Sequence, residues 1–411
     1  MRRLTALTML AVAAGCGGHG AGVSAPVALA PSTPQQVLIV SLDGFRWDYF
    51  NRPEARNLRR LAAIGVHATR MIPDFPSLTF PNHYSIATGL YPEHSGIVDN
   101  SMRDATLGAF RMSDTAAVRN AAWWGGEPIW VTAEKQGRHA GTFFWPGSEA
   151  AEEGVRPSHW LRFNDRFPNA QRVDSVLDWL SLPGGQAVSL AMLYYSDVDH
   201  AGHSFGPDSP QVDSAIARVD TMIGKLIDGI AARNLTQRVN LIVLADHGMT
   251  AISPSRAIYI DDYVPPSAID IVDLGAIGLI APHTGMLDSV YRKLNGANPH
   301  MHVYRKGELP ARFHYDTNPR ITPIVLVADL GWMMTTHAQA SRLLVLKGEH
   351  GYDNQLPDMG ALFVAEGPAF RRGITVPAFQ NIHVYDLICH ILGLHPAPND
   401  GSADSTRAFL R

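Results

Sequence analysis

The chain has 411 residues, of which 46% are hydrophobic and 18% are charged, and this composition excludes a wholly disordered chain and a coiled coil. Its 34 basic and 38 acidic residues give a net charge of −4, so the chain lacks the positive field that binds bulk nucleic acid. The two cysteines, Cys16 and Cys389, cannot form a disulfide framework for a chain of this length, whereas the 18 histidines suit metal binding.

The first 16 residues predict a signal peptide, because two arginines precede a short apolar run from Leu4 to Ala14. Ala13-Ala14-Gly15-Cys16 resembles the processing site of bacterial lipoproteins, which predicts a periplasmic protein tethered to a membrane through lipidated Cys16. An ordinary secretory signal is the alternative. Residues 17–35 are rich in Gly, Ala, Ser and Pro and are predicted to be a flexible tether. No later stretch has the length and apolar character of a membrane helix.

Residues 36–411 are predicted to form a single domain in which strands alternate with helices. The apolar run 37–42 is typical of a strand buried on both faces of a parallel sheet. The further expected elements are helix 54–64, strand 139–145, helix 171–181, strand 188–195, helix 210–232, strand 239–245, strand 361–365 and helix 383–393. This alternation predicts an α/β fold with a central, mostly parallel sheet and helices on both faces. Segments 100–135 and 252–345 break the pattern and are predicted to be insertions.

Acidic residues follow three of the predicted strands, at the edge of the sheet where such folds bind ligands. Asp43, Asp199 and Asp246 each end an apolar run, and His247 follows Asp246 directly. Three strand ends of this kind are unlikely to coincide by chance, although a single carboxylate there would be commonplace.

Two groups of metal ligands can be assembled from these positions. Asp199 and His203 are four residues apart, so one turn of helix could direct both at one ion, and His350 lies beside a glycine that could bring it close. Ligation by both carboxylate and imidazole favours zinc or manganese over magnesium. A second ion would take Asp43, Asp246 and His247.

A hydroxyl that could complete the second group is Thr79. It is predicted to lie at the N-cap position of a helix whose first residues include Pro81. The local sequence alone favours an ordinary helix cap, because serine and threonine caps are so common.

The stretch TFPNHYSIATGLYP at 79–92, with HSGIVDN at 94–100, resembles the nucleophile region of the nucleotide pyrophosphatase/phosphodiesterases of the alkaline phosphatase superfamily. The segments around the predicted metal ligands fall in that family's order, so the resemblance covers about residues 37–401, and the leader suits a bacterial member. It implies an alkaline phosphatase-like fold and two zinc ions per chain. One zinc would be held by Asp43, Thr79, Asp246 and His247, and the other by Asp199, His203 and His350.

The resemblance also implies an activity. The chain would hydrolyse phosphodiester and phosphoanhydride bonds of small-molecule nucleotides through a phosphothreonine on Thr79, releasing a nucleoside monophosphate. The Asn100 side chain and the Thr79 backbone N–H would donate hydrogen bonds to a phosphoryl oxygen, and Phe80 and Tyr194 would sandwich the nucleobase. From local sequence alone, Asn100 is a turn residue and the two aromatic rings are core residues.

The sequence is also compatible with other substrates and with a function of a different class. Lysophospholipid or choline phosphodiesters are the alternative substrates, and an exported, non-catalytic metal-containing binding protein is the alternative of a different class. A sulfatase is disfavoured because residues 79–83 lack the cysteine or serine and the arginine of that nucleophile motif, and an alkaline phosphatase-type monoesterase is disfavoured because neither a serine nucleophile nor an arginine clamp is evident. Trp123, Trp124, Trp130 and Trp145 are expected to pack the first insertion. The histidines His83, His94, His314 and His383 are expected to be ordinary polar or packing residues.

Overall fold

The computed structural model describes residues 34–411, so the predicted signal peptide, Cys16 and nearly all of the predicted tether lie outside the described residues. The central sheet has eight strands in the order β19-β2-β18-β9-β1-β8-β6-β7. Their bounds are β1 (Gln36–Leu42), β2 (Val66–Ala68), β6 (Ala140–Phe143), β7 (His159–Leu161), β8 (Leu190–Tyr195), β9 (Val239–Leu244), β18 (Phe363–Glu366) and β19 (Ile374–Val376). Strand β1 pairs in parallel with both β8 and β9, and all seven of its residues are buried, as its continuous apolar run predicts.

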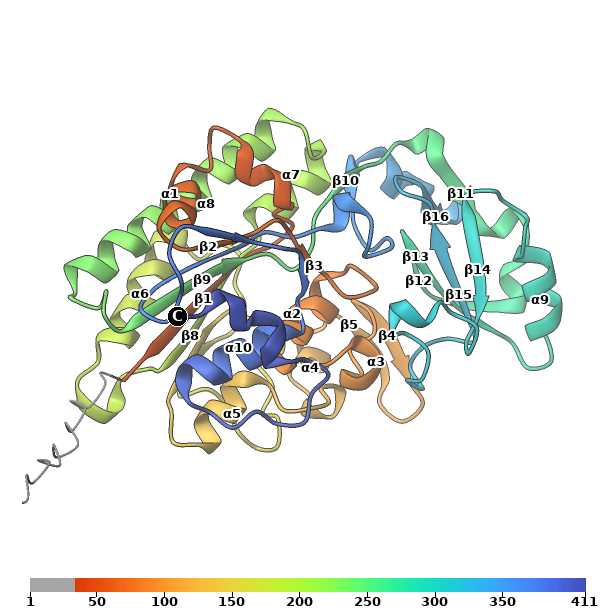
Figure 1. Cartoon of the computed structure of the whole chain (residues 1–411). Helices are drawn as coiled ribbons and strands as arrows, with labels where there is room; N and C mark the ends of the chain where they lie inside the picture. Colours follow the sequence, from red (N-terminus) through yellow and green to blue (C-terminus); the bar gives the residue numbers. More distant parts are fainter. Residues whose placement is uncertain (1–33) are drawn as a thin grey trace, which may run out of the picture. The chain divides into compact units, whose positions relative to one another are not determined.

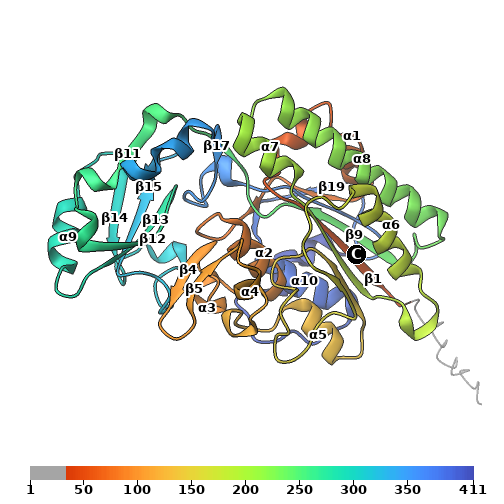
Figure 2. The same cartoon turned by 180° about the vertical axis from the view of Figure 1, so that it is seen from behind.

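Helices cover both faces of this sheet, which confirms the predicted fold class (Figures 1 and 2). Helices α1, α6, α7 and α8 pack together on one face, and α2, α5 and α10 pack together on the other. The helices are α1 (Arg56–Ile64), α2 (Thr79–Thr88), α3 (Pro92–Ser95), α4 (Thr115–Val118), α5 (Ile129–Lys135), α6 (Asn169–Ser181), α7 (Asp197–Phe205), α8 (Pro210–Ala232), α9 (Leu287–Leu294) and α10 (His383–Leu392). None of the helices in residues 34–411 is long and apolar enough to cross a membrane.

The predicted elements differ from the observed ones mainly at their ends. Strand β18 is antiparallel to both β9 and β2, so the sheet is mixed at that edge. The short strands β2, β7 and β19 were not predicted, because three residues are too few to show a period. Thr79 is the first residue of α2 and Leu78 is the cap residue, and the Thr79 hydroxyl bonds no backbone N–H of the helix. The predicted capping role of Thr79 is therefore wrong, and its hydroxyl is available to the site.

The two predicted insertions have different structures. Residues 100–135 contain the hairpin of β4 (Ser101–Asp104) and β5 (Gly108–Arg111), followed by α4 and α5. Residues 252–345 include a four-stranded antiparallel sheet with its own hydrophobic core, in the order β12-β13-β15-β14 (Figure 1). These strands are β12 (Ile269–Leu274), β13 (Ile277–Pro282), β14 (Met301–Arg305) and β15 (Ile324–Ala328); the remaining short strands are β3 (Met71–Ile72), β10 (Thr250–Ala251), β11 (Ala257–Tyr259), β16 (Met333–Thr335), β17 (Gly348–Glu349) and β20 (Phe379–Gln380).

Candidate active site

The carboxyl ends of three adjacent strands supply the acidic residues of the site. Asp43 follows β1, Asp246 follows β9, and Asp199 lies on α7 just after β8. All three side chains are buried, at 8% exposure or less. Gly44 makes this arrangement possible, because its φ is +67° and a Cβ there would lie 2.9 Å from the Cα of Asp199.

The first group of predicted ligands, Asp43, Asp246 and His247, comes together in the structure. His247 Nε2 lies 3.0 Å from Asp246 Oδ2 and 3.5 Å from Asp43 Oδ1. The Thr79 hydroxyl lies 3.2 Å from the same imidazole nitrogen. The hydroxyl therefore faces the point on which this group converges.

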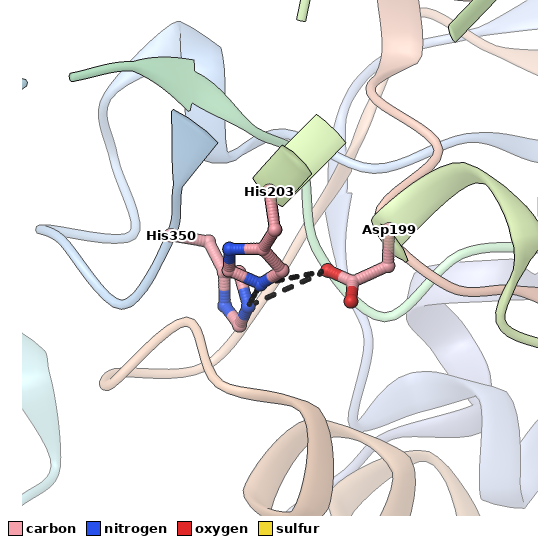
Figure 3. A group of neighbouring side chains, drawn as sticks. All are labelled: Asp199, His203 and His350. Atoms are coloured by element: carbon pink, nitrogen blue, oxygen red, sulfur yellow. Dashed lines mark hydrogen bonds and ion pairs between the residues drawn. The ribbon is translucent and has the colours of Figure 1, made fainter. Parts of the chain in front are cut away.

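The second group, Asp199, His203 and His350, also comes together, as Figure 3 shows. Asp199 Oδ1 lies 3.3 Å from His203 Nε2 and 3.5 Å from His350 Nε2, and the two imidazole nitrogens are 3.1 Å apart. Asp199 and His203 share one face of α7, as their spacing predicts. The His350 ring stacks on that of His247 with centroids 3.6 Å apart, so the two groups are neighbours.

Each of the three imidazoles is held by a backbone carbonyl on its far side. The Nδ1 atoms of His203, His247 and His350 lie 2.8–2.9 Å from the carbonyl oxygens of Gly348, Gly248 and Ser77 respectively. A carbonyl only accepts, so each Nδ1 donates a proton to it, and Nε2 is the ring nitrogen that faces the site. This is the orientation that metal-binding histidines require.

The pKa values of the three carboxyl groups are shifted because all three are buried close together. Burial raises the pKa of Asp43 well above its usual range, and the carboxylates of Asp246 and Asp199 raise it further. Burial acts in the same direction on Asp199 and Asp246, but the imidazoles that face them hold the pKa of both below the usual range. One oxygen of each carboxylate, Asp43 Oδ1, Asp199 Oδ1 and Asp246 Oδ2, is buried without a hydrogen bond in the described chain. Such oxygens are what a cation would bind.

His83, expected to be an ordinary polar or packing residue, is a buried polar residue that contacts one of the predicted ligands. It is fully buried on α2, and its Nδ1 lies 2.9 Å from the Thr79 carbonyl and 3.2 Å from Asp246 Oδ2. Its Nε2 is 2.8 Å from the Ser41 hydroxyl. His83 therefore fixes Asp246 relative to the start of α2. No local sequence pattern predicts this contact, because Ser41 and Asp246 lie on other segments of the chain.

Asn100 lies beside the start of α2. Its Oδ1 accepts a hydrogen bond from the Phe80 backbone N–H at 2.9 Å. The bond leaves the amide nitrogen of Asn100 as the group that can donate to a ligand. The side-chain amide of Asn100 therefore lies next to the backbone of the first turn of α2.

A cavity of about 390 Å³ opens next to Thr79 and contains both predicted aromatic residues, Phe80 and Tyr194. Phe80 packs against Phe110 and Trp124, at centroid distances of 5.9 and 6.0 Å. The Tyr194 hydroxyl donates to Asp43 Oδ2 at 2.6 Å, so this ring also supports the first ligand group.

Phe163 is an aromatic residue of the cavity that the sequence analysis missed. It lies just after β7, is 47% exposed, and meets the Tyr194 ring edge-on at 6.1 Å. A lone phenylalanine in a loop gives no sequence signal for this position. Of the four tryptophans expected to pack the first insertion, all are buried, and Trp145 also lines the cavity.

Comparisons with known proteins identify the family of the chain. Residues 37–353 match the family model described as type I phosphodiesterase / nucleotide pyrophosphatase. A bis(5'-adenosyl)-triphosphatase from Xenopus laevis is 39% identical over 92% of this chain and 82% of its own. The human ectonucleotide pyrophosphatase/phosphodiesterase family member 5 is 36% identical over 90% of this chain and 76% of its own. The solved structure of an inactive form of murine ectonucleotide pyrophosphatase/phosphodiesterase 5 in complex with AMP has a TM-score of 0.88, is 37% identical, and covers 92% of this chain and 100% of that chain. The chain therefore belongs to the type I phosphodiesterase / nucleotide pyrophosphatase family, within the alkaline phosphatase superfamily.

Proposed function

We propose that the chain is a two-zinc enzyme that hydrolyses phosphodiester and phosphoanhydride bonds of nucleotides and releases a nucleoside monophosphate. The observation that carries the proposal is the position of Thr79. Its hydroxyl does not cap its helix, faces His247 at 3.2 Å, and borders the cavity that holds Phe80 and Tyr194. A buried hydroxyl between a ligand group and a substrate-sized cavity is suited to attack phosphorus.

The residues fit two metal ions. Asp43, Thr79, Asp246 and His247 would hold one zinc, and Asp199, His203 and His350 the other; the convergence of carboxylate oxygens that lack a hydrogen bond in the described chain with the Nε2 atoms supports this assignment. Bound zinc would lower the pKa of the Thr79 hydroxyl and offset charge on the phosphoryl oxygens. Ligation by both carboxylate and imidazole suits zinc.

The chain's own groups supply the remaining steps. The Thr79 oxygen attacks phosphorus in line, the leaving group departs, and the phosphothreonine is hydrolysed by water. The Asn100 amide donates to a non-bridging phosphoryl oxygen from the position that its bond to Phe80 fixes. Loss of one such donor typically lowers turnover by a factor of about 10² to 10³.

Nucleotides are the proposed substrates because of the side chains that line the cavity. Aromatic rings line it together with polar side chains, Thr115 and Arg162 among them. A nucleobase offers an aromatic face and a polar edge, whereas an acyl chain offers neither. The murine relative in complex with AMP and the Xenopus relative named as a triphosphatase support the same class.

The test compares three variants on ATP and on bis(p-nitrophenyl) phosphate. Thr79→Ala should abolish turnover and leave the zinc content near two per chain, whereas Thr79→Ser should remain active because its hydroxyl can still attack. Thr88→Ala is the matched control, because Thr88 lies at the other end of α2 and bonds only backbone there. Appreciable turnover by the Thr79→Ala variant would refute the proposal. Faster turnover of lysophosphatidylcholine than of ATP would identify a lipid phosphodiesterase instead.

We also propose that the protein is exported and anchored through lipidated Cys16, on the pattern of residues 1–16. Metabolic labelling with a fatty acid should mark the wild type and not a Cys16→Ser variant. Labelling of both forms, or of neither, would contradict the anchor.

A further inference from the structure

A buried carboxyl group outside the active site has no counter-charge. Asp74 lies on the loop between β3 and α2 and is 1% exposed. Its backbone N–H donates to Asn82 Oδ1 at 2.6 Å, which fixes the loop against α2. Both of its carboxylate oxygens are nevertheless buried without a hydrogen bond in the described chain.

Two further side-chain oxygens on neighbouring segments are also buried without a hydrogen bond in the described chain. Ser85 Oγ and Asn381 Oδ1 are buried, and neither makes a hydrogen bond within residues 34–411. Asn381 is tied to this place because its Nδ2 donates at 2.9 Å to the same Asn82 oxygen that Asp74 uses. Ser85 lies one turn along α2 from Asn82, and the interaction of its hydroxyl with the Asp74 carboxyl group lowers the pKa of Asp74 by more than Asp400 raises it.

The charges around Asp74 do not balance it. Among the charged side chains of residues 34–411, the one that shifts the pKa of Asp74 is Asp400, which is also acidic and raises it. Asp400 is already occupied, since its Oδ2 accepts from the Tyr91 backbone N–H at 2.9 Å and lies 2.7 Å from His94 Nδ1. A buried carboxyl group in a folded protein is normally neutral because it keeps its proton, or is neutralised by a nearby cation.

We propose that Asp74, Ser85 and Asn381 form a binding site for a monovalent cation, Na⁺ or K⁺, beneath the helix that carries Thr79. The unsatisfied atoms are all oxygens, which are the ligands that hard cations take. The site contributes one carboxylate and two neutral oxygens, so a single positive charge leaves it neutral. A divalent ion would need further carboxylates. The bound ion would join the loop, α2 and the segment after β20.

A proton competes with this ion. Burial raises the pKa of Asp74 from 3.8 to about 7, with Asp400 adding to the rise, so the carboxyl group is largely neutral in acid. The other titratable groups on this side are Tyr91, whose pKa Asp74 and Asp400 help to raise, and His94, which is paired with Asp400. The effect of the cation should therefore be strongest above neutral pH.

The experiment measures the melting temperature of the zinc-loaded chain at pH 8.5, in NaCl or KCl and in N-methyl-D-glucamine chloride of equal ionic strength. Because an ion that binds only the folded state stabilises it, the wild type should melt higher in the small cation, by roughly 1 to 2 °C for each kcal/mol of binding. Asp74→Asn should abolish the difference, since the amide keeps the shape and removes the charge. Asp178→Asn is the matched control, because Asp178 is a surface carboxylate paired with Arg233.

The outcomes are distinct and do not depend on the proposed enzyme activity. A cation effect that is lost in the Asp74→Asn variant, kept in Asp178→Asn and weaker at pH 5.5 supports the site. An anomalous peak from Tl⁺ beside Asp74 in a crystal would locate the ion directly. No cation effect in the wild type, or an equal effect in the Asp74→Asn variant, would overturn the proposal and leave Asp74 as a buried neutral acid.

Discussion

The hydrogen bond from Tyr194 to Asp43 makes it possible to separate the role of the Tyr194 hydroxyl in metal binding from the role of its ring in substrate binding. Tyr194 lines the substrate cavity, but its hydroxyl is 2.6 Å from Asp43 Oδ2. A hydrogen bond to a charged group contributes about 1.5 to 3 kcal/mol. Losing a group that orients a metal ligand typically costs about 10- to 100-fold in metal affinity or activity. Tyr194→Phe keeps the ring and removes only this bond.

We therefore expect Tyr194→Phe to need about 10 to 100 times more free zinc for half-maximal activity, and to recover most of its turnover once zinc is saturating. The assay is turnover of ATP in a zinc-buffered titration series. Tyr195→Phe is the matched control, because that hydroxyl contacts the Asn169 carbonyl at 3.4 Å and belongs to neither ligand group. An unchanged zinc midpoint for the Tyr194→Phe variant would refute the reasoning. A loss that saturating zinc does not restore would show that the hydroxyl acts on the substrate.

Further predictions follow from the same geometry. Removing zinc with a chelator should lower the melting temperature together with turnover, because the ions bind only the folded state, and His350→Ala should retain one zinc as measured by elemental analysis. Phe80→Ala and Phe163→Ala should each lower kcat/KM for ATP by a factor of roughly 5 to 150, with a smaller loss on bis(p-nitrophenyl) phosphate; equal losses on both substrates would indicate a structural role. In solutions free of Na⁺ and K⁺, the raised pKa of Asp74, about 7 against 3.8, favours the protonated folded state, so stability should fall as the pH rises from 4 to 7, by about 4 kcal/mol at most. Urea unfolding across this range should show a flatter profile for Asp74→Asn.

The sequence predicted those parts of the site that lie at strand ends. The buried apolar runs of β1, β8 and β9 are continuous, and parallel strands that are neighbours bring their carboxyl ends together. The relation of Asp199 to His203 follows from helical spacing alone. His350 lies far along the chain from both, and it was grouped with them on weaker signals, its neighbouring glycine and the family resemblance.

The parts that could not be predicted depend on contacts between distant segments. His83 is buried against Asp246, from which it is 163 residues away in the chain, and no local pattern records that contact. Phe163 lies in a loop without periodicity, and Asp74 precedes Phe75-Pro76, where an aspartate is typical of a turn. The sheet of residues 252–345 was missed because an antiparallel insertion breaks the alternation on which the main fold was recognised.

The helix α2 explains how one short segment can serve both the nucleophile and its surroundings. Its first turn gives the Thr79 hydroxyl to the site, and the Thr79 carbonyl accepts from His83, which also contacts Asp246. One residue before His83, the Asn82 amide donates to the carbonyls of Pro76 and Leu78, at 2.9 Å each, and so holds the loop that leads into the helix. Because every polar side chain in this turn is committed to the loop or the ligand group, Thr79 has little freedom to move. The hydroxyl is thus held in place before any substrate arrives, and positioning of this kind lowers the entropic cost of the attack on phosphorus.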